Sequence, residues 1–432
     1  MSNLKKLTLS FIFIVFVLFA ILSFFPSIFF DRTIKHFILP LSLMLIMIFD
    51  LLNGKVKIHT STINVLIFFL FWISYSLSSA LWSPAVNKTL IYTCYIAVNT
   101  ITFYYINRFF LKPISIKIIV YSLIAMFVLY QVISIWEIIT WNHLPGTKFD
   151  IDNFKVYIPS GPFYNRNDFA AVMLLLLPLV MFSLKYIKNK IVKFFLTLSI
   201  IISFVSMILQ GARIGLIAFI MLTAIFMFFY TSIKTKAIFL ASIVLISVFI
   251  ANSNLPVIKL LRLTATKELV SFAREQQSIK LTSIKIRKEL FSQAVDISYE
   301  SFFCGVGSGG FENTMSKWRK NKTYGVLSAH NYFLEVLSTN GIFITILLLM
   351  FFSFWIYDLT KLIKKTNGTL RFLNTSLLFT LIMFLFSSSL PSGIMRYYLY
   401  WIVLSIIHLF IVLQKEDLAN VEKEFNYTEQ LR

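Results

Sequence analysis

The chain has 432 residues, of which 58% are hydrophobic and 17% aromatic, and it carries a formal net charge of +21. A soluble domain does not bear this much apolar surface, so the composition excludes that class and indicates an integral membrane protein. The basic balance does not indicate nucleic-acid binding, because most Lys and Arg residues of the short loops lie at the ends of apolar runs. Of the two cysteines, Cys94 falls inside a predicted span and Cys304 lies in a predicted outer loop. We therefore expect neither a disulfide nor a metal cluster.

Twelve apolar runs have the length of membrane-spanning helices, which need about 20 residues to cross a hydrocarbon core of about 30 Å. The sequence therefore predicts an all-α integral membrane protein. The first run follows Lys5 and Lys6 but is too long and too aromatic for a cleaved signal peptide, so we expect a retained anchor. The predicted spans cover residues 7–30, 36–53, 62–83, 88–110, 115–140, 167–184, 191–209, 212–232, 236–252, 330–357, 371–390 and 396–414.

The distribution of Lys and Arg predicts that both termini are cytoplasmic. With this orientation the inner connections carry fifteen of these residues and the short outer connections carry five, as the positive-inside rule requires. The predicted organisation is nine transmembrane helices in residues 1–252, a large extracytoplasmic loop in 253–329, three more helices in 330–414 and a cytoplasmic tail in 415–432.

Two of the predicted outer connections are long, residues 141–166 and 253–329, and the second is too long for a plain connection. Its apolar residues between 283 and 299 recur at roughly helical spacing, which predicts an amphipathic helix on the outer face. The 253–329 loop holds twelve Lys and Arg against six Asp and Glu. Such a basic loop suits an anionic lipid-linked substrate, but it also suits the anionic membrane surface.

Arg213 is the strongest single candidate for a functional residue. It lies in a short polar joint, residues 210–215, between two apolar runs, where an ionisable side chain is costly to desolvate. A guanidinium suits a phosphate, because its planar fork donates two parallel hydrogen bonds. The alternative is an arginine that anchors a helix end at the lipid headgroups. Arg287 offers the same chemistry on the predicted loop helix, with a solvated helix face as its alternative.

His330 and Asn331 begin an apolar run at the end of the large loop. An imidazole can accept a proton near neutral pH, so His330 is a candidate general base, with a capping or interfacial histidine as the alternative. Glu335 shares a helix face with Asn331 and would support this corner. An unbroken helix over 330–357 would be about 42 Å long at ~1.5 Å per residue, so we expect a tilt or a break at Asn340–Gly341.

Two further motifs lie in the predicted outer loops. Residues 305–311 are rich in glycine, and glycine lets backbone N–H groups approach an anion, so Gly307 is a candidate substrate-binding residue. The alternative is a flexible connection back to the membrane. Asp150 and Asp152 have the spacing of a metal-dependent glycosyltransferase motif. Because a three-residue pattern such as 150–152 often matches by chance, we favour a polar surface loop.

The order of four of these stretches resembles the O-antigen ligase and O-antigen polymerase-related family of bacterial membrane glycosyltransferases. Together the stretches span residues 160–341, while the first third and the last two spans resemble the family only in hydropathy. They are the segment 160–170 before a mid-chain span, the joint Gly211–Ala212–Arg213, Arg287 with the glycine-rich stretch 305–311, and residues 329–335 with Asn340–Gly341.

This resemblance implies a GT-C-like membrane enzyme of the bacterial cytoplasmic membrane, with its active site on the extracytoplasmic face. Such enzymes move a glycan from undecaprenyl pyrophosphate to an acceptor hydroxyl. Carried over, Arg213 and Arg287 would hold the pyrophosphate, His330 would act as general base or orient the acceptor, and Asn331 and Gly307 would contact substrate. Neither metal nor cofactor is expected, because arginines offset the charge of the leaving group. The acceptor would be a lipid A core or a second lipid-linked glycan.

A transporter or flippase for a lipid-linked glycan is the alternative class, because it also combines twelve spans with buried charges. Against it, the sequence shows no clear repeat of two halves, and the polar candidates gather at one predicted face rather than at the midplane. A purely structural scaffold would leave the set of Arg213, Arg287 and His330 unexplained.

Overall fold

The computed structural model describes residues 59–110, 113–145, 147, 158–237, 283–319 and 325–430, together with Met44 and Ile48. Several predicted features lie outside these residues. They are the spans 7–30 and 36–53 (apart from Met44 and Ile48), nearly all of 236–252, the Asp150–Asp152 motif and the loop residues 253–282.

Every regular element in the described ranges is a helix, which confirms the predicted all-α class. Nine described helices are long and apolar enough to cross a membrane, and the predicted total of twelve is not tested. These helices are α3 (Thr60–Ser78, extended to Leu81 by the 3-10 turn η2), α4 (Val86–Phe109), α5 (Pro113–Thr140), α6 (Arg166–Ser183), α7 (Lys190–Gln210), α8 (Arg213–Tyr230), α13 (Tyr332–Lys365), α14 (Gly368–Ser387) and α15 (Tyr398–Gln430).

The centre of the bundle is formed by α6 and by the first part of α15. In these two helices, 89% and 94% of the most apolar window is buried, compared with 28% in α7 and α8. Helix α6 packs on α14, α5, α7 and α8, while α15 packs on α4 and α13. The helices with apolar side chains on every face are therefore enclosed by protein, and those exposed at the periphery present Ile and Phe outward, as expected for contact with lipid.

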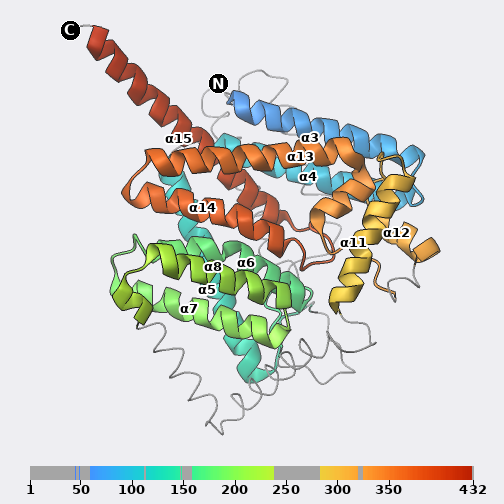
Figure 1. The fold of residues 1–432 in the computed structure, drawn as a ribbon, viewed down its shortest axis with the longest axis horizontal. Coiled ribbons are helices and arrows are strands. Elements are labelled where there is room, and N and C mark those ends of the chain that lie inside the picture. The colour runs from blue at the N-terminus through green and yellow to red at the C-terminus, as the bar shows by residue number, and fades with distance from the viewer. Residues whose placement is uncertain are drawn as a thin grey trace, which may run out of the picture.

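One end of the bundle carries the large loop. Figure 1 shows α11 (Ser283–Glu300) and the short α12 (Phe311–Thr314) lying across the end where α3 meets α4 and α14 meets α15. The apolar face of α11, formed by Leu290, Ala294 and Ile297, packs against Phe311 and Met315. The predicted amphipathic helix is therefore present, and its buried face seats it on the bundle.

Helix α13 is broken where the sequence predicts a break. Gly341 has φ 80° and ψ 178°, far from helical values, so the carbonyl groups of Ser338 and Thr339 lose their helical partners. The glycine-rich loop supplies replacements: Val306 N–H donates to Ser338 O at 2.9 Å, and Gly307 N–H donates to Thr339 O at 3.0 Å. On the other side of the break, Ile342 N–H donates to Phe303 O at 2.9 Å.

The two backbones approach so closely that neither Gly305 nor Gly341 can carry a side chain. A Cβ atom on Gly305 would lie 2.5 Å from Thr339 O, and one on Gly341 would lie 2.5 Å from Phe303 O. Both glycines also have positive φ, a region that L-residues rarely adopt. This pair of glycines therefore allows the large loop to dock on the broken helix.

We expect Gly341→Ala to destabilise the protein strongly, by the backbone strain of about 1–3 kcal/mol plus the collision with Phe303 O. Gly368→Ala is the matched control, because Gly368 also has positive φ (58°) but a Cβ atom there would meet no atom within 4 Å. Thermal unfolding in detergent should show a much larger loss of Tm for Gly341→Ala. Equal losses in the two variants would mean that the docking of the loop contributes nothing.

Candidate functional site

The turn between α14 and α15, residues 388–397, gathers groups from three distant parts of the chain. Arg287 of α11 donates from Nη1 to the carbonyl of Ser389 at 3.2 Å. The imidazole of His330 lies against the backbone of Leu390 and Pro391. A Cβ atom on Gly215, in the first turn of α8, would lie 3.4 Å from a methyl group of Leu390. The predicted residues Arg287 and His330 are thus brought together, and the helix that begins with Arg213 abuts the same turn.

The pKa of His330 is lowered from its ordinary value. Burial of the ring is the main cause and the nearby Arg287 cation is the second, while the backbone of Leu390 and Pro391 acts in the opposite direction. A lowered pKa keeps the imidazole neutral at pH 7. Its Nδ1 atom has no hydrogen-bond partner among the described residues. His330 is therefore a neutral imidazole held beside a cation, which is the state required of a proton acceptor.

Arg213 is placed by a helix-to-helix joint. Helix α7 ends at Gly211, whose left-handed backbone (φ 65°, ψ 30°) lets the chain reverse direction. Arg213 is then the first residue of α8. The preceding Gln210 is buried and donates from Nε2 to Pro159 O at 2.9 Å. The joint is therefore tied to the first long connection, and Arg213 projects from a fixed backbone.

Glu137, which the sequence analysis did not single out, organises the end of that connection. Its fully buried carboxylate accepts from the N–H groups of Ser160 (3.0 Å) and Gly161 (2.7 Å), and it pairs with His143 Nδ1 at 2.8 Å. A buried carboxylate with several hydrogen-bond donors is a stable structural clamp. Glu137 therefore fixes the segment before α6, and it is this segment that contacts Gln210 through Pro159.

Asn331 caps helix α13. Its Oδ1 atom accepts from Leu334 N–H at 3.1 Å, which is the usual role of an asparagine at this position. Its Nδ2 group makes no hydrogen bond to another described residue. The prediction of substrate contact by Asn331 is therefore restricted to that amide nitrogen.

Gly307 has a structural role in this fold. Its N–H group donates to Thr339 O, and a Cβ atom would lie 2.6 Å from the Cβ atom of Ser83. The N–H groups of Gly305, Val306 and Ser308 are also bonded within the protein. The expectation that Gly307 offers its N–H to an anion does not fit this geometry, because the break in α13 already uses that donor.

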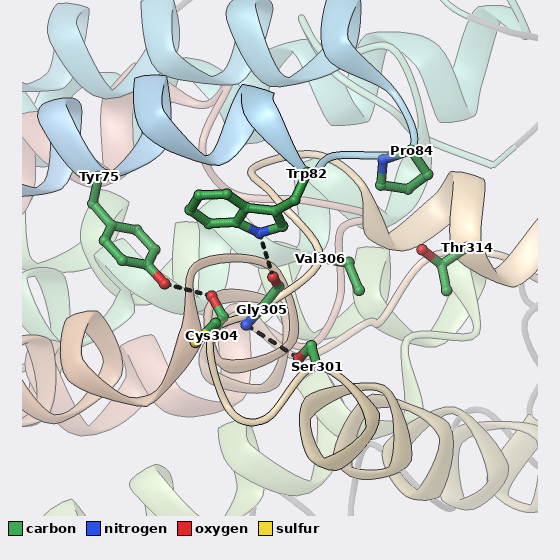
Figure 2. A pocket seen from close by; sticks show the side chains of 8 residues that line it. All are labelled: Tyr75, Trp82, Pro84, Ser301, Cys304, Gly305, Val306 and Thr314. Carbon is green, nitrogen blue, oxygen red and sulfur yellow. Dashed lines mark hydrogen bonds between the residues drawn. The ribbon is translucent and has the colours of Figure 1, made fainter.

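A cavity of about 550 Å³ lies beside the glycine-rich loop. Figure 2 shows Tyr75 and Trp82 on one side of it, with their polar atoms directed at the loop backbone. The Tyr75 hydroxyl donates to Cys304 O at 2.5 Å, and the Trp82 indole donates to Gly305 O at 2.9 Å. None of the five predicted site residues lines this cavity, so it is a neighbour of the Arg287–His330 corner rather than part of it.

A second cluster of polar residues, which the sequence analysis also missed, lies at the C-terminal end of the 388–397 turn. Arg396 lies here with Tyr397, and both are electrostatically coupled to Asp168 at the start of α6. Glu335 of α13 and Tyr92 of α4 are further charged or polar neighbours of Arg396. In the sequence, Arg396 counted only as one of the few basic residues in a short outer connection.

Comparison with known proteins finds similarity to proteins of glycan assembly. Residues 198–349 match the family described as O-antigen ligase. The chain is also similar to the teichuronic acid biosynthesis protein TuaE of Bacillus subtilis (strain 168), with 27% identity over 354 residues, which cover 80% of this chain and 70% of that protein. No solved structure matches. The predicted resemblance to the O-antigen ligase and polymerase-related family is confirmed, and the matched segment contains Arg213, Arg287 and His330.

We expect Arg287→Gln to raise the pKa of His330, because it removes the cation that helps to lower it. Arg287→Lys should keep the pKa low, since the charge remains. Ring ¹³C shifts of histidine-labelled protein, followed against pH, measure this, with His330→Asn assigning the signal. Arg108→Gln at the other end of the bundle is the control. An unchanged titration in Arg287→Gln would show that Arg287 and His330 do not form one electrostatic unit.

Proposed function

Because the chain is related to the O-antigen ligases and polymerases, we propose that it transfers a glycan from undecaprenyl pyrophosphate to an acceptor hydroxyl on the outer face of the bacterial cytoplasmic membrane. The observation that carries this proposal is the convergence of Arg287, a neutral His330 and the first turn of α8 on one turn at one end of a membrane bundle. This arrangement places a cation beside a neutral imidazole, and these are the two kinds of group that the proposed transfer needs.

Arg213 and Arg287 would bind the pyrophosphate. A guanidinium matches two phosphate oxygens with two parallel N–H groups, which gives both charge and orientation. Burial lowers the pKa of Arg287 from its ordinary value, but a guanidinium remains protonated at neutral pH, so the cation persists. As the bond between the sugar and the pyrophosphate breaks, charge grows on the leaving oxygen, and these fixed cations stabilise it. In this proposal the transfer needs no metal ion.

His330 would act as general base. The acceptor oxygen attacks the anomeric carbon, its proton passes to the imidazole, and the electron pair of the broken bond leaves with undecaprenyl pyrophosphate. Attack from the side opposite the leaving group inverts the anomeric configuration. The Nδ2 group of Asn331, which is not used in capping, would orient the acceptor or the sugar. Gly307 would act only indirectly, by holding the loop that connects α11 to α13.

The acceptor would be a second lipid-linked glycan in a polymerase, or a lipid A core in a ligase. The family description names the ligase reaction. The related Bacillus subtilis protein is named for teichuronic acid biosynthesis, and its name does not distinguish the two acceptors. A lipid-linked glycan transporter is the alternative class, and it would move the donor across the membrane without forming a new glycosidic bond.

The orientation of the bundle can be tested with Cys304, which is free and exposed beside the glycine-rich loop. We expect a membrane-impermeant maleimide to label Cys304 in intact cells. In a Cys304→Ser background, Lys188→Cys, in the connection between α6 and α7 at the opposite end, should be labelled only after permeabilisation. Labelling of Lys188→Cys alone in intact cells would invert the map and separate the site from an outer substrate.

The chemical roles can be tested by substitution, with turnover of a lipid-linked glycan as the measurement. His330→Ala should lower turnover by about 10²–10⁴-fold, the range of general-base assistance, and retain donor binding. Turnover should also fall as the pH drops through the lowered pKa of His330, because the protonated ring cannot accept a proton. Arg213→Ala and Arg287→Ala should abolish transfer, and Lys should restore little of it.

Two results would contradict these roles. Normal turnover with a flat pH profile in His330→Gln would make His330 a positioning residue. Full activity in both Arg→Lys variants would show that positive charge alone, and not a bidentate fork, is required. Glycan that crosses the membrane without a new glycosidic bond would favour the transporter.

A further inference from the structure

Arg396 occupies the turn that also receives Arg287 and His330. The turn contacts Arg287 through Ser389 and His330 through Leu390 and Pro391. Arg396 lies five residues further along, just before α15 begins at Tyr398. Its side chain is exposed, whereas the residues on either side of it, Met395 and Tyr397, are buried. The Arg396 cation is therefore accessible to solvent, while the residues that hold its backbone are buried.

A chain of hydrogen bonds holds the Arg396 side chain in place. The guanidinium carbon of Arg396 lies 5.2 Å from the centre of the Tyr397 ring, and its Nη2 atom donates to the Tyr397 hydroxyl at 3.3 Å. The Tyr397 hydroxyl in turn donates to Asp168 Oδ2, which also accepts from Asn165 Nδ2 at 2.8 Å. A stacked guanidinium retains little rotational freedom, so Asp168 and Tyr397 fix its direction.

The remaining donors of Arg396 are available to a ligand. A guanidinium has five N–H donors, and within the described part of the chain Arg396 uses them only toward the Tyr397 hydroxyl, with no carboxylate in ion-pair contact. Burial by itself would lower the pKa of Arg396, but the neighbouring Tyr397 and Asp168 raise it more, so the charge is retained. Such a fixed and unfilled fork is suited to an oxyanion.

The neighbours of Arg396 indicate that this oxyanion belongs to a sugar-bearing substrate. Glu335 and Tyr92 are hydrogen-bonded to each other and lie near Arg396, and a Cβ atom on Gly393 would lie 3.5 Å from Glu335 Oε1 and 3.7 Å from the Tyr92 hydroxyl. A carboxyl group and a phenol are hydrogen-bond partners for sugar hydroxyl groups. Together with the guanidinium they offer complementary groups to a ligand with both hydroxyls and an acidic group.

We propose that Arg396 binds an oxyanion of the substrate, with Tyr397 and Asp168 as its positioning residues. The oxyanion is either the carboxylate of an acidic sugar or a phosphate of the lipid pyrophosphate, since both present two oxygens in the plane that a guanidinium recognises. This inference rests on the proposed function and adds a third arginine to the site, one that lies outside the segment matched to the O-antigen ligase family.

The test measures binding to the full-length protein in phosphatidylcholine nanodiscs with two probes. Geranyl pyrophosphate reports the phosphate, and trigalacturonic acid reports a sugar carboxylate. We expect Arg396→Gln to weaken binding of at least one probe by tenfold or more, and the affected probe identifies the source of the oxyanion. Arg396→Lys should recover only part of the loss, because it keeps the charge but not the fork.

Arg108→Gln is the matched control, because Arg108 also contacts a tyrosine hydroxyl (Tyr104, 3.0 Å) and its ring, but at the other end of the bundle. It should bind both probes like the unaltered protein. Tyr397→Phe keeps the ring and removes the hydroxyl, and it should weaken binding less than Arg396→Gln does. Since Arg396 is exposed, its variants should retain the Tm of the unaltered protein, so a loss of binding is not a loss of fold.

Unchanged affinity for both probes in a folded Arg396→Gln protein would overturn the proposal. Failure of the broader function has a different signature. If Arg213→Gln and Arg287→Gln leave geranyl pyrophosphate binding unchanged, the assigned pyrophosphate site is wrong, whereas a loss of trigalacturonic acid binding in Arg396→Gln would still establish the oxyanion subsite.

Discussion

The architecture of the loop-bearing end of the bundle depends on how the peptide groups freed at Gly341 form new hydrogen bonds. A bilayer offers no water to a broken helix, so each lost hydrogen bond must be replaced by protein. The glycine-rich loop makes these replacements through Val306 and Gly307, and Phe303 accepts from the other side of the break. The need to satisfy these groups in the membrane therefore holds the loop on α13. The same contacts position α11 and its Arg287.

The second constraint is the turn between α14 and α15. It presents the carbonyl of Ser389 to Arg287 and the backbone of Leu390 and Pro391 to His330. Backbone groups held between α14 and α15 are rigid partners, so the Arg287 cation and the His330 imidazole keep a fixed spatial relation. Arg287 and His330 are therefore electrostatically coupled, because the cation that would bind an anion also lowers the pKa of the imidazole.

The sequence predicted what depends on local composition, and missed what depends on distant pairing. The apolar runs and the break at Gly341 could be predicted from the sequence, and Arg287 on the loop helix and His330 at the start of a span could be chosen as candidates. The pairing of Tyr397 with Asp168 joins residues 229 positions apart and left no local signal. Asn331 was assigned to substrate although its position before a helix also fits a cap, and Gly307 was assigned to an anion because the competing acceptor, Thr339, comes from another segment.

The docking of the glycine-rich loop also separates two tasks along the chain. Backbone hydrogen bonds near residue 306 hold the end of α11 against α13, while Phe311 and Met315 cover the apolar face of α11. The spacing between α11 and α13 therefore depends on backbone groups of the loop, which a side-chain substitution does not remove.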